Sequence, residues 1–320
     1  MAQSASYDFT LTRDNLIDLA LSYVSARGTG ETPSADQVTD ASRLFNMIVK
    51  LRAADGMPAW ALKRGYILPF SGASSLNTDS HVVTVYDATK VTSTAASGAA
   101  DIIVDSNTGM ATSDQIGVEL DGGTMQWTTI NAIAGSTITL TSTLTGGTAS
   151  GARVYTYTAS SDRVQKPIRI IMADVLHQAD QTSHEIDVVS RDEYYDLGAR
   201  TSKGTPNQMY YTIHPSSDTA LNTNGQIFVY PRFNDGDYVI EFTYQRPFAD
   251  FDVAGDNPDF PQAFYLPLML ELASLLGPMF GVPPEERKSI FTESRYYWDL
   301  AWQTVSEEGS YRIIPEIPDA

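Results

Sequence analysis

The chain has 320 residues, no cysteine, and 39 acidic against 21 basic side chains, which gives a formal net charge of −18. The absence of cysteine excludes disulfides, thiol catalysis and thiolate zinc sites. Broad binding to nucleic acid is disfavoured, because phosphate binding depends on lysine and arginine. Residues 1–70 carry seven basic and seven acidic side chains, so the acidic excess lies downstream. It indicates either a well-solvated surface or an acidic passage that DNA crosses without binding.

Two amphipathic helices are predicted near the N-terminus. The first covers about 13–27 and has Thr12 as its N-cap, and the second covers about 34–55. The second opens with the capping-box sequence Ser34–Gln37, in which the two terminal side chains bond reciprocally to free backbone N–H groups. Each helix places its apolar side chains on one face. We therefore expect the two helices to pair as a hairpin.

A sharp change in composition marks residues 71–161. Thr, Ser, Gly, Ala and Val dominate there, and Lys90 and Arg153 are the only basic residues before Arg163. Short alternating apolar runs between glycine turns predict strands near 82–86, 101–104, 116–120, 124–130, 137–142 and 153–158. We expect this segment to be a small β-barrel or sandwich inserted into the surrounding domain.

The segment that follows is also predicted to consist mainly of strands. Ser190 caps a short helix, and the last two strands are joined through residues 234–237 as part of a meander. The predicted strands lie at 167–175, 185–189, 208–213, 226–233 and 238–245.

The C-terminal part is predicted to form a second antiparallel helical hairpin. Residues 264–281 are apolar on nearly every face except at Glu271 and Ser274, and residues 285–308 are amphipathic. The first helix is nearly long enough to span a bilayer, but Glu271 near its middle and its flanking prolines favour a buried core or subunit-interface helix. The residues expected to form that core or interface are Leu268, Glu271, Leu272, Leu275 and Met279.

Together these elements predict an α+β fold whose helical core is built from N-terminal and C-terminal hairpins, with a β-meander and the inserted small β-barrel or sandwich. Four parts follow: an N-terminal helical part (1–70), the inserted β domain (71–161), the meander with the C-terminal hairpin (162–309), and a tail (310–320). The tail carries Tyr311, Ile313, Ile314 and Ile317 among prolines. This composition indicates either disorder or docking on another chain.

No pattern typical of an enzyme or cofactor site occurs. The sequence has no phosphate-binding glycine loop and no Gly-x-Ser-x-Gly, its four histidines lack metal-ligand spacing, and the aspartates of 250–259 depart from the EF-hand. We therefore expect no catalytic residue, no cofactor and no metal. The adjacent pairs Asp192–Glu193 and His184–Glu185 leave carboxylate catalysis on glycans open, and the many tyrosines and tryptophans leave sugar or base stacking open.

Several stretches carry a resemblance when they are taken as an ordered set. They are residues 16–21, 51–60, 241–248 and 258–261, followed by the two C-terminal helices. In this order the chain resembles the head-to-tail adaptor proteins of tailed phages, also called tail accessory factors or packaged-DNA stabilisation proteins. The resemblance covers roughly residues 10–70 and 165–308, and the β insert departs from the smallest members of the family.

The resemblance implies a structural virion protein rather than an enzyme. Such a protein forms a homo-oligomeric ring, expected to be dodecameric, that binds the portal protein after packaging, closes the DNA-filled capsid and presents a platform for tail nozzle, tail tube or fibre proteins. Genomic DNA would pass through the lumen without specific binding, the C-terminal tail would reach the portal, and no membrane would be involved. The expected location is the neck of the virion, between head and tail, and the host cytoplasm during assembly.

Two other classes of function stay open at this point. One is a virion-associated glycan or peptidoglycan hydrolase with carboxylate catalysis in the β region. The other is a receptor-binding tail protein that uses residues 71–161 to contact the host cell.

Overall fold

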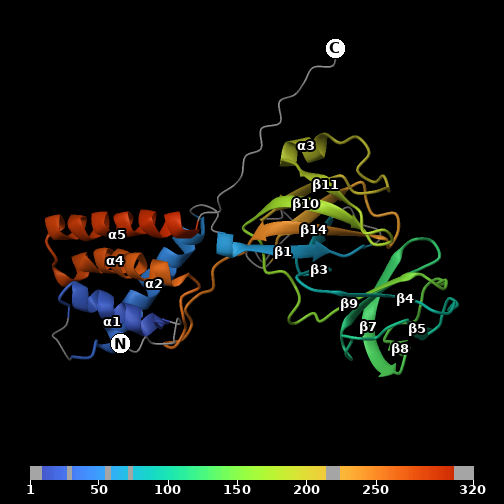
Figure 1. Cartoon of the computed structure of the whole chain (residues 1–320), viewed down its shortest axis with the longest axis horizontal. Helices are drawn as coiled ribbons and strands as arrows, with labels where there is room; N and C mark the ends of the chain where they lie inside the picture. The colour runs from blue at the N-terminus through green and yellow to red at the C-terminus, as the bar shows by residue number, and fades with distance from the viewer. Residues whose placement is uncertain (1–8, 27–30, 55–58, 71–74, 214–223, 306–320) are drawn as a thin grey trace, which may run out of the picture. The chain divides into compact units, whose positions relative to one another are not determined.

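The computed structural model describes residues 9–26, 31–54, 59–70, 75–213 and 224–305 (Figure 1). Contacts within the chain divide it into two compact units. The helical unit comprises residues 1–61 and 248–320, and the β unit comprises residues 62–247.

The helical unit is organised around α4 (Tyr265–Leu276), which contacts α1 (Arg13–Tyr23), α2 (Ala35–Ala54) and α5 (Pro284–Val305). Figure 1 shows α4 lying between α1 and α5. Three helices therefore cover most of the apolar surface of α4, while Leu266 and Leu275 stay exposed. Short 3-10 turns accompany these helices: η1 (Ala59–Ala61), η2 (Gln262–Phe264) and η3 (Gly277–Phe280).

The predicted helix starts are confirmed. The Thr12 hydroxyl accepts a hydrogen bond from Asn15 N at the start of α1. Before α2, Ser34 N donates to Gln37 Oε1 and Gln37 N donates to Ser34 Oγ, which completes the capping box. α5 begins with Pro284 and two glutamates in its first turn, where the missing N–H is harmless and negative charge faces the positive end of the helix dipole.

The larger sheet of the β unit has eight strands in the order β2-β13-β12-β11-β10-β14-β1-β3. Its edge strands β2 and β3 are separated by only residues 78–81, so the sheet curls back on itself. A continuous apolar cluster fills its interior. The strands are β1 (Leu62–Ile67), β2 (Ser75–Asn77), β3 (Val82–Val83), β10 (Arg169–His177), β11 (Ser183–Val188), β12 (Gln208–Thr212), β13 (Gln226–Tyr230) and β14 (Tyr238–Gln245).

The smaller sheet has six strands in the order β4-β9-β6-β7-β8-β5. An isolated bridge between Val91 and Val104 joins the ends of β4 and β5, and Thr92 N donates to Ile103 O at 2.8 Å beside it. These contacts close the curled sheet around a second apolar cluster. Its strands are β4 (Asp87–Lys90), β5 (Asp101–Ile103), β6 (Gln115–Glu119), β7 (Met125–Ala134), β8 (Thr137–Leu140) and β9 (Arg153–Tyr157).

The expected α+β fold with a helical core from hairpins at both termini is wrong. The described residues form fourteen strands against five α-helices, and the protein is mostly β, in two curled sheets. The apolar sequence of α4 led us to expect that the rest of the chain covers it. Instead α1, α2 and α5 cover α4, while the β unit buries side chains of its own strands in three separate clusters.

Strand β1 was not predicted, although it lies between β14 and β3. Lys63, Arg64 and Gly65 interrupt the apolar alternation that marks a strand in sequence. Gly65 is required by packing, because a Cβ there would lie 2.7 Å from the ring of Phe242. Close packing against Phe242 therefore accounts for the glycine, while Lys63 and Arg64 are exposed.

Candidate functional site

Exposed apolar surface is concentrated on the helical unit. Of the seventeen large apolar side chains that are exposed among the described residues, twelve belong to this smaller unit and five to the β unit. Contiguous exposed apolar area marks an interaction surface, whereas single exposed apolar residues carry no such meaning, so the helical unit is the candidate for such a surface. The twelve are Phe9, Leu19, Tyr23, Met47, Leu51, Val253, Leu266, Leu275, Met279, Phe291, Tyr296 and Leu300.

The five α4-region residues expected to form a core or interface divide into two groups. Leu268 and Leu272 are completely buried within the helical unit, and Glu271 is 6% exposed. Leu275 and Met279 are 46% and 55% exposed. The first three therefore stabilise the helical unit itself, and the last two are available to a partner.

Glu271 is held by a network from three helices. The Arg52 guanidinium of α2 donates to both carboxylate oxygens, from Nε to Oε2 at 3.0 Å and from NH2 to Oε1 at 2.9 Å. Trp298 of α5 donates from Nε1 to Oε2 at 2.9 Å, and the Arg52 guanidinium lies 4.4 Å from the centroid of a Trp298 ring. The bidentate pair and the indole thus satisfy the charge that an apolar helix otherwise buries at high cost.

The segment that contains Glu271 also meets the length and composition of a membrane span. Residues 262–280 have a mean hydropathy of 1.5, and 61% of that window is buried in the structure. Its buried charge is paired with Arg52, 219 residues away in the sequence. The spacing of the sequence could not reveal this partner.

The surfaces of α2 and α5 offer two different apolar faces. On α2, Met47 and Leu51 are exposed beside Lys50, and on α5 Tyr296 and Leu300 are exposed. Because the two faces differ, a contact that joins the first face of one copy to the second face of another is heterologous. Such contacts propagate from subunit to subunit and close into rings when the rotation allows.

Of the carboxylates considered for chemistry, Glu193 is used by the cap of its own helix. Glu193 Oε2 accepts from Ser190 N in the capping box of α3 (Arg191–Asp196), and this backbone bond holds the pKa of Glu193 below its usual range. His184 and Glu185 are consecutive on β11, so their side chains point to opposite faces of the strand. Neither pair presents two convergent groups to a substrate.

The aspartates after β14 stabilise a loop of the helical unit. Asp256 accepts from the backbone N–H groups of Asp252 and Val253, at 2.7 and 2.8 Å, and Asp259 accepts from Ala249 N. Within the described ranges no group of three or more His, Asp or Glu side chains is arranged to hold a metal ion.

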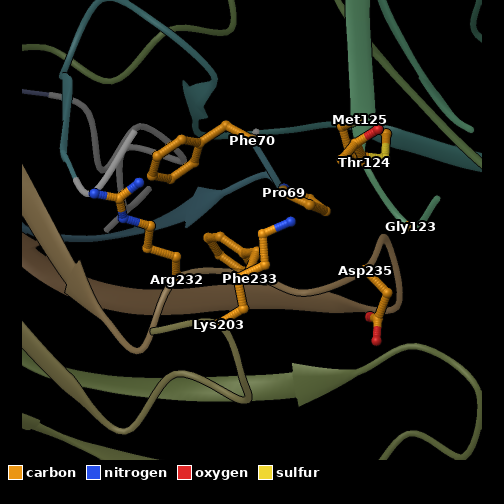
Figure 2. A pocket seen from close by; sticks show the side chains of 9 residues that line it. All are labelled: Pro69, Phe70, Gly123, Thr124, Met125, Lys203, Arg232, Phe233 and Asp235. Carbon is orange, nitrogen blue, oxygen red and sulfur yellow. The ribbon is translucent and has the colours of Figure 1, made fainter. Parts of the chain in front are cut away.

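A small enclosed cavity in the β unit lies between Pro69, Phe70 and Phe233, with the turn at Gly123 beside it (Figure 2). Its volume is about 30 Å³, which is room for roughly one water molecule. In Figure 2 the Lys203 side chain extends towards Pro69 and Phe233. A cavity of this size does not accommodate an organic substrate.

His81 is a largely buried histidine at the junction of the two sheets, and its pKa is lowered. It stacks on Trp127 with the ring centroids 4.0 Å apart, and its Nδ1 lies 3.2 Å from the Tyr157 hydroxyl. Burial, together with the nearby Arg163, lowers the pKa of His81 to about 4. These contacts join the two sheets of the β unit, so we assign His81 a structural role.

Some expected site residues lie outside the described part of the chain. They are the tail residues Tyr311, Ile313, Ile314 and Ile317, which were expected to dock on the portal. Comparison of the sequence with models of known protein families and with curated proteins gives no match.

Proposed function

We propose that this chain is a structural protein of a tailed-phage virion, a head-to-tail adaptor that self-associates into a ring and binds the portal. In this role it has no catalytic site and no cofactor. It closes the DNA-filled head and presents a platform to tail nozzle, tail tube or fibre proteins, in the neck of the virion after assembly in the host cytoplasm.

The observation that carries the proposal is the exposed apolar surface of the helical unit. In this unit α4 packs against three helices and Glu271 is paired, yet α2, α4 and α5 still expose large apolar side chains. Burying those side chains against further copies removes their apolar area from water, at about 25 cal/mol per Å².

Two further features support the same role. The stretches that resemble adaptor proteins include residues 16–21, 51–60 and 258–261, which belong to the helical unit. The net charge of −18 suits a ring whose lumen DNA traverses, because phosphate is repelled and slides without binding.

The first test is light scattering of the purified protein, alone and mixed with the portal protein of the virus that encodes it, followed by electron microscopy. We expect a species of low mass alone and a stoichiometric collar with the portal. A species of unchanged mass in the presence of the portal contradicts the proposal, and clearing of peptidoglycan by the purified protein in a gel contradicts its non-enzymatic part.

A matched pair of variants tests the surface itself. Met47→Ser removes a side chain that is 66% exposed on α2, and Val85→Ser removes one that is 61% exposed in the β unit. We expect Met47→Ser, combined with Leu51→Ser, to leave the folded subunit intact and to weaken collar formation, while Val85→Ser leaves collar formation unchanged. Equal effects of the two substitutions contradict an interface on α2.

A further inference from the structure

A groove of about 400 Å³ lies beside the turn between α4 and α5 in the helical unit. Leu275 and Phe291, both exposed, supply its apolar surface, and Ser274, Pro284, Glu285, Arg287 and Lys288 line it as well. It therefore combines apolar area with two cations and one carboxylate, a net positive charge.

This combination continues along one flank of α5. At 3.6 residues per turn, Arg287, Lys288, Phe291 and Arg295 fall within an arc of about 100°, Asp299 lies about 20° outside this arc, and Glu286 and Glu293 fall on the opposite side. The guanidinium of Arg295 lies 5.6 Å from the centroid of the Phe291 ring. A basic and apolar flank thus occurs in a chain of net charge −18; it consists of Arg287, Lys288, Phe291 and Arg295.

We propose that residues 306–320 of the same chain dock in this groove and along this flank. The segment has four acidic residues and one basic residue, and it carries Tyr311 and three isoleucines. Of the segments outside the described ranges, it is the one whose sequence combines several large aliphatic side chains with net negative charge. Its charge and its apolar content both complement the groove.

The chain is long enough for this contact. The groove residue Phe291 precedes Val305, the last described residue, by 14 positions, which is about 21 Å along a helix. Ile313 and Ile314 follow Val305 by eight and nine positions, which span up to about 27–30 Å when extended. Pro315 and Pro318 favour an extended backbone, so little further conformational entropy is lost when the segment lies in a groove.

In the docked state, residues 306–320 are bound to their own chain before any partner protein binds. The isoleucines are then shielded from water and from other chains, and a partner that binds the segment has to compete with the groove. This inference goes beyond the proposed adaptor role and does not depend on it, because it concerns a contact within one chain.

Cysteine trapping in the full chain tests the contact, because the protein has no cysteine of its own. The test pairs combine Leu275→Cys with Ile313→Cys or with Ile314→Cys, so that a difference of one residue in register does not hide the contact. The control pair combines Ile314→Cys with Tyr296→Cys, an exposed position about 140° around α5 from Phe291. Oxidation with copper phenanthroline in dilute solution is followed by peptide mapping of the disulfides.

We expect an intrachain disulfide in at least one test pair to form about tenfold or more faster than in the control, because docking raises the effective concentration of the two thiols. Adding Arg287→Glu and Lys288→Glu to that pair should slow its disulfide towards the control rate. Equal rates in test and control pairs, or disulfides that join two chains, would overturn the proposal. The result stands whether or not the protein binds a portal.

Discussion

At the scale of single residues, the β unit depends on a histidine that stays neutral. His81 adopts a positive φ of 57° and presents its ring to Trp127, whose Nε1 donates to Pro69 O at 2.9 Å. The backbone N–H of His81 donates to the Tyr157 hydroxyl. Protonation would place a charge in this packed junction, and that cost is the physical reason for the lowered pKa.

The first prediction concerns pH. Because the pKa of His81 is about 4 in the folded protein against 6.5 as its usual value, only the unfolded chain takes up the proton between these values. The free energy of unfolding should therefore fall as the pH drops from 6.5 to 4, by up to about 3 kcal/mol, with no further loss from this group below pH 4. Denaturant titrations across this range, followed by tryptophan fluorescence, measure it.

The control for this prediction is His81→Asn, since asparagine tolerates the same backbone conformation and does not titrate. The variant should be less stable at pH 7, where it lacks the stacked ring, and its stability should change less between pH 6.5 and 4. If wild type and variant lose stability in parallel over this window, His81 is not the group responsible.

The second prediction concerns the buried pair in the helical unit. Glu271→Ala leaves the largely buried Arg52 without its carboxylate and Trp298 without its acceptor, so we expect about 3 kcal/mol of destabilisation. The double variant Glu271→Met with Arg52→Met replaces both charges by apolar groups and should recover most of the loss. Unfolding free energies of the singles and the double give the coupling; additive losses would mean that the pair is not coupled. We also expect Glu271→Ala to impair assembly, as a result of lost folding.

At the scale of elements, the third prediction concerns the contact between β6 and β7. A Cβ at Gly117 would lie 2.7 Å from the Trp127 ring, which the hydrogen bond to Pro69 and the stacked His81 hold in place. Gly117→Ala should therefore displace the indole and destabilise the β unit by about 2 kcal/mol. Gly122→Ala is the matched control, because nothing lies within 4 Å of a Cβ there. Urea unfolding of both variants compares them, and a Gly117→Ala protein as stable as the control would contradict this packing.

The elements also show which features could be predicted from the sequence. The Thr12 cap, the Ser34–Gln37 box and the amphipathic face of α5 are encoded by neighbours in the chain, so local patterns were sufficient. β1 escaped prediction because the need for Gly65 arises from Phe242, a residue of another strand. The predicted overall architecture was wrong for the same reason. The helices that pack on α4 and the strands that close each sheet come from distant parts of the sequence.

The candidate site was also predicted only in part from the sequence. Composition identified the α4 region as apolar, but it could not separate Leu268 and Leu272, which are buried, from Leu275 and Met279, which are exposed. That distinction depends on where α1, α2 and α5 lie. The exposed faces of α2 and α5 were not predicted as sites, although Met47 and Leu300 are visible in the sequence as large apolar residues outside the apolar stripes of their helices.

At the scale of the whole molecule, the chain passes between the two units twice, after Ala61 and after Pro247. Within each unit, the residues next to these two points lie close together. In the helical unit the rings of Trp60 and Phe248 stack with centroids 6.1 Å apart, although 187 residues lie between them in the sequence. In the β unit, Leu62 at the start of β1 pairs with Gln245 at the end of β14. Closely spaced ends are typical of a domain inserted into another, and each part then has its own core.

The last prediction follows from these ends. A chain in which residues 62–247 are replaced by a short Gly-Ser linker should retain the helical unit, because the linker has only to join Ala61 to Phe248 across a stacked pair of rings. Residues 62–247 expressed alone should fold as a β protein with the His81-dependent pH profile. Circular dichroism and cooperative denaturant unfolding test both shortened proteins. The linked chain keeps both Glu271 and Arg52, so its buried ion pair can still form. If this chain does not unfold cooperatively, the helices require the β unit to fold. The exposed apolar side chains of α2 and α5 would then no longer support an assembly surface.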